Sequence, residues 1–181
     1  TFHTPLTAQG LDATYHLASR PFINGLQNCR LLINSARGPV VDNAALVEFM
    51  DSSSLKDVVI DCWENEPEIN GELLKKAFVA TPHIAGYSYQ GKENATIMAV
   101  RAVARHLGIK ALRYYKPQDQ EEGHEPVLLD LKGKNHGEIA AVLQYNYPIF
   151  TDDFRLRMNP AGFEKLRAAY QYRREIYVED K

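Results

Sequence analysis

The chain has 181 residues, of which 45% are hydrophobic and 24% are charged, and its formal net charge is −2. This composition suffices for a packed core in one domain or two small ones. The basic residues form no stripe of the kind that binds nucleic-acid phosphates, so we do not expect a nucleic-acid partner. No apolar run approaches the roughly 20 residues that span a bilayer, and the first residues lack the pattern of a signal peptide, so we expect a cytoplasmic protein without a membrane partner.

The two cysteines, Cys29 and Cys62, match no metal-ligand spacing and stand beside predicted strands. Free cysteines in such places behave as small hydrophobic residues. We therefore expect both to be buried, and we expect neither a disulfide nor a metal site.

Short apolar runs alternate with helical periodicity from residue 1 to about residue 108. The predicted strands cover residues 1–5, 29–36, 55–63 and 78–83, and the predicted helices cover residues 16–26, 42–50, 72–77 and 89–107. Asp42 is the expected N-cap of the second helix. The alternation predicts an α/β fold in which helices cover a parallel sheet.

The composition changes after Gly108, where residues 109–125 are polar and rich in turn formers and are predicted to be a linker. Beyond it we expect a smaller α+β unit over residues 126–181. Its predicted elements are a strand at 126–134, helices at 137–147 and 163–175, and a short apolar run at 176–178.

The ends of the predicted strands carry the residues of interest, because ligands of open parallel sheets bind beyond the carboxyl ends of the strands. Four such ends read HTP at 3–5, NSARG at 34–38, DCWENEP at 61–67 and TPHIAGY at 81–87. Segments that are distant in sequence are thus expected to converge in space.

Within these ends, Arg37 could grip a substrate carboxylate through two parallel hydrogen bonds, and His83 could exchange a proton with a hydroxyl near neutral pH. Glu66 could accept a hydrogen bond from His83 and so set its tautomer, while Asp61 could bond a ribose hydroxyl or carboxamide. Each residue also has a plainer interpretation: a surface arginine, a structural histidine, a solvated acid and a loop cap. Together they form a set suited to moving a hydride and a proton.

The motifs NSARG, DCWENEP and HIAGY resemble those of the D-isomer-specific 2-hydroxyacid dehydrogenase family, with Cys62 in place of the usual valine. The resemblance implies the second half of a Rossmann-type doubly wound parallel sheet, with NAD as cofactor. It implies catalytic roles for Arg37, Glu66 and His83, in which His83 exchanges the proton and Glu66 is its partner. The residues that it places near NAD are Thr4, Ser35, Ala36, Arg37, Asp61 and Gly86.

The loop DCWENEP then has an interpretation of its own. We expect Glu66 to turn back toward His83, Pro67 to stiffen the loop, and Glu64 and Glu68 to face solvent.

The segment HIAGYSYQGKE and the long extension beyond Gly108 resemble one branch of the family, which acts on a small phosphorylated hydroxy acid and carries a C-terminal dimerisation domain. This implies that Tyr87 and Arg37 contact the substrate and that the chain forms a homodimer through residues 126–181. A tyrosine in an interface is the plainer interpretation of Tyr87.

The sequence departs from the family in lacking G-x-G-x-x-G and the acidic residue that would hold the adenosine ribose. We expect that half of the cofactor domain to lie upstream of Thr1, and we expect this chain alone neither to bind NAD tightly nor to turn over. The alternatives are another family member, such as a phosphoglycerate or glyoxylate-type reductase, a non-catalytic dimerisation or regulatory module, and a nucleotide-sensing corepressor.

Overall fold

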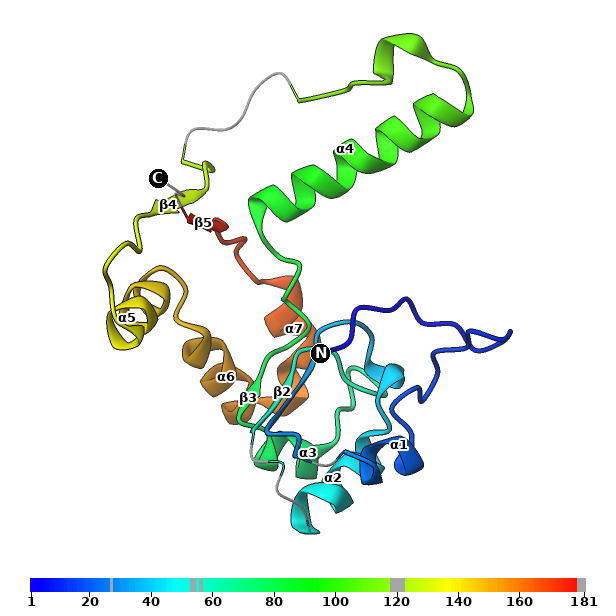
Figure 1. The fold of residues 1–181 in the computed structure, drawn as a ribbon, viewed down its shortest axis with the longest axis vertical. Helices are drawn as coiled ribbons and strands as arrows, with labels where there is room; N and C mark the ends of the chain where they lie inside the picture. Colours follow the sequence, from blue (N-terminus) through cyan, green and yellow to red (C-terminus); the bar gives the residue numbers. More distant parts are fainter. Residues whose placement is uncertain (27, 53–54, 56, 118–122, 179–181) are drawn as a thin grey trace. The chain divides into compact units, whose positions relative to one another are not determined.

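A computed structural model describes residues 1–26, 28–52, 55, 57–117 and 123–178 (Figure 1). Contacts divide the chain into two compact units. Unit 1 comprises Thr1–Ala85 and Pro148–Tyr170, and unit 2 comprises Gly86–Tyr147 and Gln171–Lys181. The division therefore falls before the long helix, whereas the sequence suggested boundaries near residues 108 and 125.

Unit 1 is built on the parallel strands β1 (Leu31–Asn34), β2 (Asp57–Ile60) and β3 (Val79–Ala80), in the order β1-β2-β3. Asn34 pairs with Ile60, and Ile60 pairs with Ala80, so the carboxyl ends of the strands are level. Phe2 makes an isolated parallel bridge to Asn34, so the predicted strand at residues 1–5 is a single bridge in the structure.

Helix α1 (Arg20–Asn24) precedes β1, while α2 (Asn43–Ser52) connects β1 to β2 and α3 (Gly71–Lys76) connects β2 to β3. Asp42 caps α2 as predicted, because its Oδ1 accepts a hydrogen bond from Ala45 N at 2.9 Å. The predicted helix at 16–26 is shorter than expected, since Pro21 occupies the first turn and α1 begins only at Arg20.

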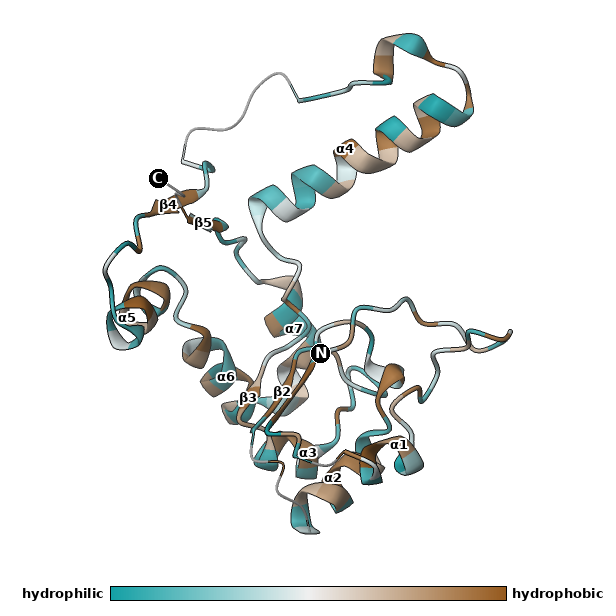
Figure 2. Ribbon diagram, in the orientation of Figure 1, coloured by the Kyte–Doolittle hydropathy of each residue, from teal (hydrophilic) through white to brown (hydrophobic). Residues whose placement is uncertain are grey.

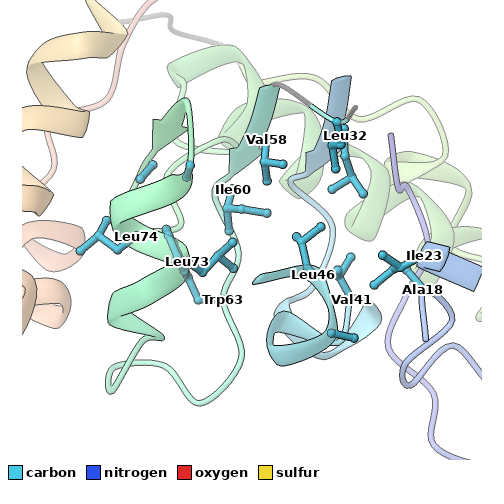
Figure 3. Packing of buried hydrophobic residues seen from close by; sticks show 14 of the residues in the cluster. Ala18, Ile23, Leu32, Val41, Leu46, Val58, Ile60, Trp63, Leu73 and Leu74 are labelled. Atoms are coloured by element: carbon cyan, nitrogen blue, oxygen red, sulfur yellow. The ribbon is translucent and has the colours of Figure 1, made fainter. Parts of the chain in front are cut away.

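The core of unit 1 lies between the strands and these helices (Figure 3), and Figure 2 shows the strands as a hydrophobic band. Val58 and Ile60 point from β2 toward Leu46 of α2 and Leu73 of α3, and all four side chains are fully buried. Alternate residues of a strand face the same side, so β2 supplies one packed face to both helices.

The C-terminal part of unit 1 contains α6 (Ile149–Met158) and α7 (Phe163–Ala168), joined by a 3₁₀ turn at Pro160–Gly162. Leu156 and Phe163 belong to the same core cluster as the strands. The sequence analysis predicted no element at 149–158, and the predicted helix at 163–175 ends at Ala168.

Unit 2 contains α4 (Tyr89–His106), a 3₁₀ turn at Lys110–Leu112, β4 (Val127–Leu129), α5 (His136–Asn146) and β5 (Ile176–Val178). Ser88 caps α4 by accepting from Gly91 N, and Asn135 begins α5 with a capping box completed by Glu138. Strands β4 and β5 pair in parallel. Part of the predicted linker, residues 118–122, lies outside the described residues.

Among the described residues, no helix is both long and apolar enough to cross a membrane.

Candidate active site

His83 and Glu66 form a hydrogen-bonded pair at the carboxyl edge of the sheet of unit 1. His83 Nδ1 lies 2.8 Å from Glu66 Oε2 and 3.1 Å from Oε1, and the two side chains are only 23% and 19% exposed. A carboxylate at this distance favours the tautomer that carries the proton on Nδ1, which leaves the lone pair on Nε2. The pairing expected from the sequence is therefore present in the structure.

The backbone around this pair is unusual. His83 has φ +57° and Asn65 has φ +58°, both in the left-handed region that non-glycine residues rarely adopt. Residues held there cost about 1–3 kcal/mol and are common at functional sites. Both loops are therefore held in one conformation by contacts from outside themselves.

Asp61 supplies most of these contacts for the loop that carries His83. Its Oδ1 accepts hydrogen bonds from Thr81 Oγ1 and Ile84 N, both at 2.7 Å, and its Oδ2 accepts from Ala85 N at 3.0 Å. His83 N donates to the Asp61 carbonyl at 2.9 Å. Asp61 thus fixes the histidine loop, and its contact with the cofactor remains a prediction.

Trp63 fixes the loop that carries Glu66. Its backbone N donates to Glu66 Oε1 at 2.8 Å, and its indole Nε1 donates to the Thr81 carbonyl at 2.9 Å. The indole is buried, so it joins the end of β2 to the end of β3. The sequence analysis missed this role, for which the only local signal was an indole donor placed directly after a predicted strand.

Gly38 allows the Arg37 loop to approach Trp63. A Cβ on Gly38 would lie 1.7 Å from the Trp63 carbonyl oxygen and 2.1 Å from its carbon. Because both atoms are backbone, no side-chain rotation could make room. Glycine is thus required at this position for close approach, although its φ is not positive.

Arg37 follows the end of β1, and its side chain is exposed. Its NH1 donates to the Ala36 carbonyl at 2.7 Å. Buried Asn34 shapes this loop, because its Nδ2 donates to the Arg37 and Cys62 carbonyls at 3.1 and 3.3 Å and its Oδ1 accepts from Ala36 N. The sequence analysis did not single out Asn34.

Cys62 is buried, and its Sγ lies 3.8 Å from Asp61 Oδ2. Burial raises the pKa of the Cys62 thiol, the negative charges of Asp61 and Glu66 raise it further, and the positive charge of Arg37 lowers it. Cys29 is half-buried rather than buried, and both cysteines are free thiols.

One group of potential metal ligands occurs among the described residues: His16, Asp42 and Glu64, whose ligand atoms lie within 4.8 Å of one another. These atoms already bind protein groups. His16 Nε2 lies 2.6 Å from Glu64 Oε1, and Glu64 Oε2 accepts from Asn43 N at 2.7 Å. The group joins three loops through these polar contacts. The expectation that Glu64 faces solvent is therefore wrong, because residues distant in sequence cover it.

The residues expected near NAD lie in both units. In unit 1, Phe2 pairs with Asn34, the last residue of β1; Thr4 follows two residues after Phe2, and Ser35 and Ala36 follow directly after Asn34. Thr4 Oγ1 is buried without a hydrogen-bond partner among the described residues. An orphaned buried hydroxyl at this edge fits a polar ligand that completes its bonding.

Gly86 and Tyr87 belong to unit 2. Gly86 is exposed, and a Cβ at this position would meet no atom within 4 Å. Tyr87 is half-buried, with Lys92 Nζ 4.2 Å from its ring centroid and the Tyr172 ring centroid at 5.6 Å.

Comparison with known proteins identifies relatives of the chain. Residues 1–85 match the family described as D-isomer specific 2-hydroxyacid dehydrogenase, NAD binding domain. Erythronate-4-phosphate dehydrogenase of Bacteroides thetaiotaomicron is 42% identical over 97% of this chain and 48% of its own length. The enzyme of the same name from Teredinibacter turnerae is 40% identical over 96% of this chain and 48% of its own length.

A solved structure of D-lactate dehydrogenase from Aquifex aeolicus, complexed with NAD and lactic acid, has 26% identity and a TM-score of 0.45 over 61% of this chain and 37% of that chain. The chain spans about half the length of the curated relatives that it matches. From these matches, residues 1–85 are similar to the NAD binding domain of the D-isomer specific 2-hydroxyacid dehydrogenase family, and 97% of the chain is similar to erythronate-4-phosphate dehydrogenase of Bacteroides thetaiotaomicron.

Proposed function

We propose that the gene product containing this chain oxidises 4-phospho-D-erythronate to 2-oxo-3-hydroxy-4-phosphobutanoate with NAD, as a step of pyridoxal phosphate biosynthesis. The observation that carries the proposal is the His83–Glu66 pair, with Nδ1 and Oε2 2.8 Å apart. The names of the relatives that are 42% and 40% identical indicate the substrate.

In this reaction, neutral His83 accepts the hydroxyl proton of the substrate on Nε2 as the carbinol carbon is oxidised. Glu66 stabilises the imidazolium that forms, and Arg37 binds the substrate carboxylate through its guanidinium. When bound, NAD supplies the hydride acceptor. Thr4, Ser35, Ala36, Arg37, Asp61 and Gly86 are the residues proposed to hold it, and Tyr87 is proposed to contact the substrate.

A comparison of substrates tests the proposal. The purified gene product is given NAD and either 4-phospho-D-erythronate, 3-phospho-D-glycerate or D-glycerate, and NADH formation is followed. We expect the highest kcat/KM with 4-phospho-D-erythronate. A higher kcat/KM with another acid would indicate that the gene product is a different enzyme of the family. If no NADH formed with any of the acids, a non-catalytic module would be favoured.

We also propose a homodimer formed through residues 126–181. Its support is the exposed apolar surface of this segment, where Leu128 is 59% exposed and Tyr145 is 88% exposed. Exposed apolar patches are common at subunit interfaces. Sedimentation of wild type and Tyr145→Glu tests this. If the dimer uses this surface, the variant should dissociate into monomers at protein concentrations at which wild type remains dimeric. Unchanged sedimentation would exclude this surface.

A further inference from the structure

The C-terminal segment Pro148–Tyr170 is fixed to the sheet of unit 1 by polar contacts. Asp153 Oδ1 accepts a hydrogen bond from Ala80 N, the last residue of β3, at 2.7 Å. Arg157 bonds Asp153 at 2.8 Å, the Ala77 carbonyl at 2.7 Å and the Leu74 carbonyl. Both carboxylate oxygens of Asp153 are therefore occupied, and the segment lies in a defined place against α3 and β3.

Helix α7 directs Arg167 toward the site. Phe163 and Arg167 are four residues apart and so lie on the same face of the helix. Phe163 is only 1% exposed and belongs to the core cluster, so this face is turned toward the body of unit 1. Arg167 NH1 lies 3.8 Å from Glu66 Oε2.

The guanidinium of Arg167 is not an ordinary surface group. Its side chain is 38% exposed, yet Nε is buried and has no hydrogen-bond partner among the described residues. Leaving a buried donor unpaired is unfavourable, so the residue is held there by the packing of α7 rather than by its own hydrogen bonds.

Glu66 therefore contacts two hydrogen-bonding groups and lies near one guanidinium. These three groups come from three places in the sequence. Trp63 N and His83 Nδ1 bond its oxygens directly, and Arg167 adds a full positive charge beside Oε2. A cation at this place attracts the carboxylate and restricts its rotation. The carboxylate orientation in turn sets which nitrogen of His83 can accept a proton.

We propose that Arg167 is a positioning residue that holds Glu66 in the orientation required by His83, so that the C-terminal extension contributes to the catalytic site as well as to subunit pairing. This inference rests on the proposed function, because its effect is read in turnover. Arg167 acts through Glu66 and does not itself exchange the proton.

The experiment uses the complete gene product and measures kcat and the KM for NAD with 4-phospho-D-erythronate. Arg167→Met is expected to lower kcat roughly three- to tenfold, as suits a partly exposed charge that acts through a neighbour, with little change in the KM for NAD. Arg167→Lys keeps the charge and should recover part of the loss. Arg155→Met on α6, whose side chain is 62% exposed and pairs with Asp152, is the matched control and should behave as wild type.

A double-mutant cycle separates positioning from a general structural effect. In a Glu66→Gln background, Arg167→Met should cause no further loss, because its target has already been altered. An equal loss in both backgrounds, or wild-type kcat in Arg167→Met, would overturn the proposal.

If wild type itself shows no turnover, the proposed function fails, and crystal structures of wild type and Arg167→Met then decide the inference. A Glu66 carboxylate rotated away from His83 in the variant would support it, and an unchanged pair would overturn it.

Discussion

Replacing Gly38 with alanine tests the close packing between the Arg37 loop and the Glu66 loop. The added Cβ would lie 1.7 Å from Trp63 O, and since ordinary contact begins at 3.4 Å, the two backbones would have to separate by about 1.7 Å. Such a shift breaks the Asn34 hydrogen bond to the Cys62 carbonyl as well as overpacking the site. Overpacking costs about 1–3 kcal/mol and each lost bond about 1 kcal/mol, so we expect a loss of about 3 kcal/mol.

Thermal unfolding of the 181-residue chain, followed by circular dichroism, measures this loss. For a chain of this size, 3 kcal/mol corresponds to a midpoint about 6–12 °C lower. Gly71→Ala is the control, because a Cβ at that position, at the start of α3, meets no atom within 4 Å and alanine favours the helix. Equal midpoints for Gly38→Ala and Gly71→Ala would refute the requirement for glycine.

Three further results are expected. Because burial and nearby carboxylates raise the pKa of the Cys62 thiol, iodoacetamide at neutral pH should label Cys29 much faster than Cys62, as mass spectrometry of peptides would show; equal labelling would contradict it. Asp153→Ala removes the acceptor of Ala80 N and the carboxylate partner of Arg157, so it should lower the free energy of unfolding by about 3–5 kcal/mol and expose the C-terminal segment to limited proteolysis. Trp63→Phe removes the indole donor and should cost about 1–3 kcal/mol in denaturant unfolding, whereas a wild-type curve would show that the bond to the Thr81 carbonyl is dispensable.

The sequence predicted the sheet of unit 1 and the pairing of His83 with Glu66 because both depend on local patterns. Apolar runs such as that of β2 (Asp57–Ile60) end just before the candidate site residues, and parallel strands bring those ends to one edge. His83 and Glu66 meet as expected for that reason. The long helix α4 was also predicted correctly, since Ile97, Val100 and Ala104 follow helical spacing along it.

The features that sequence missed depend on contacts between distant segments. Helix α6 has an apolar pattern broken by Asp152 and Asp153, and the second of these is buried because it bonds Ala80 N, more than seventy residues earlier in the chain. Glu64 was expected to face solvent, and it is instead covered by the pairing with His16, which lies 48 residues away. No window of sequence contains both partners, so neither contact could be predicted from periodicity.

The most direct test of catalysis at the sheet edge is the turnover of the complete gene product with NAD and 4-phospho-D-erythronate, comparing wild type with His83→Asn. Asparagine fits the volume of the site but cannot accept the hydroxyl proton, so we expect kcat to fall by about 10²–10⁴ while the variant remains folded. A kcat within a few-fold of wild type would contradict the role of His83 in proton transfer, and with it the function assigned to the His83–Glu66 pair.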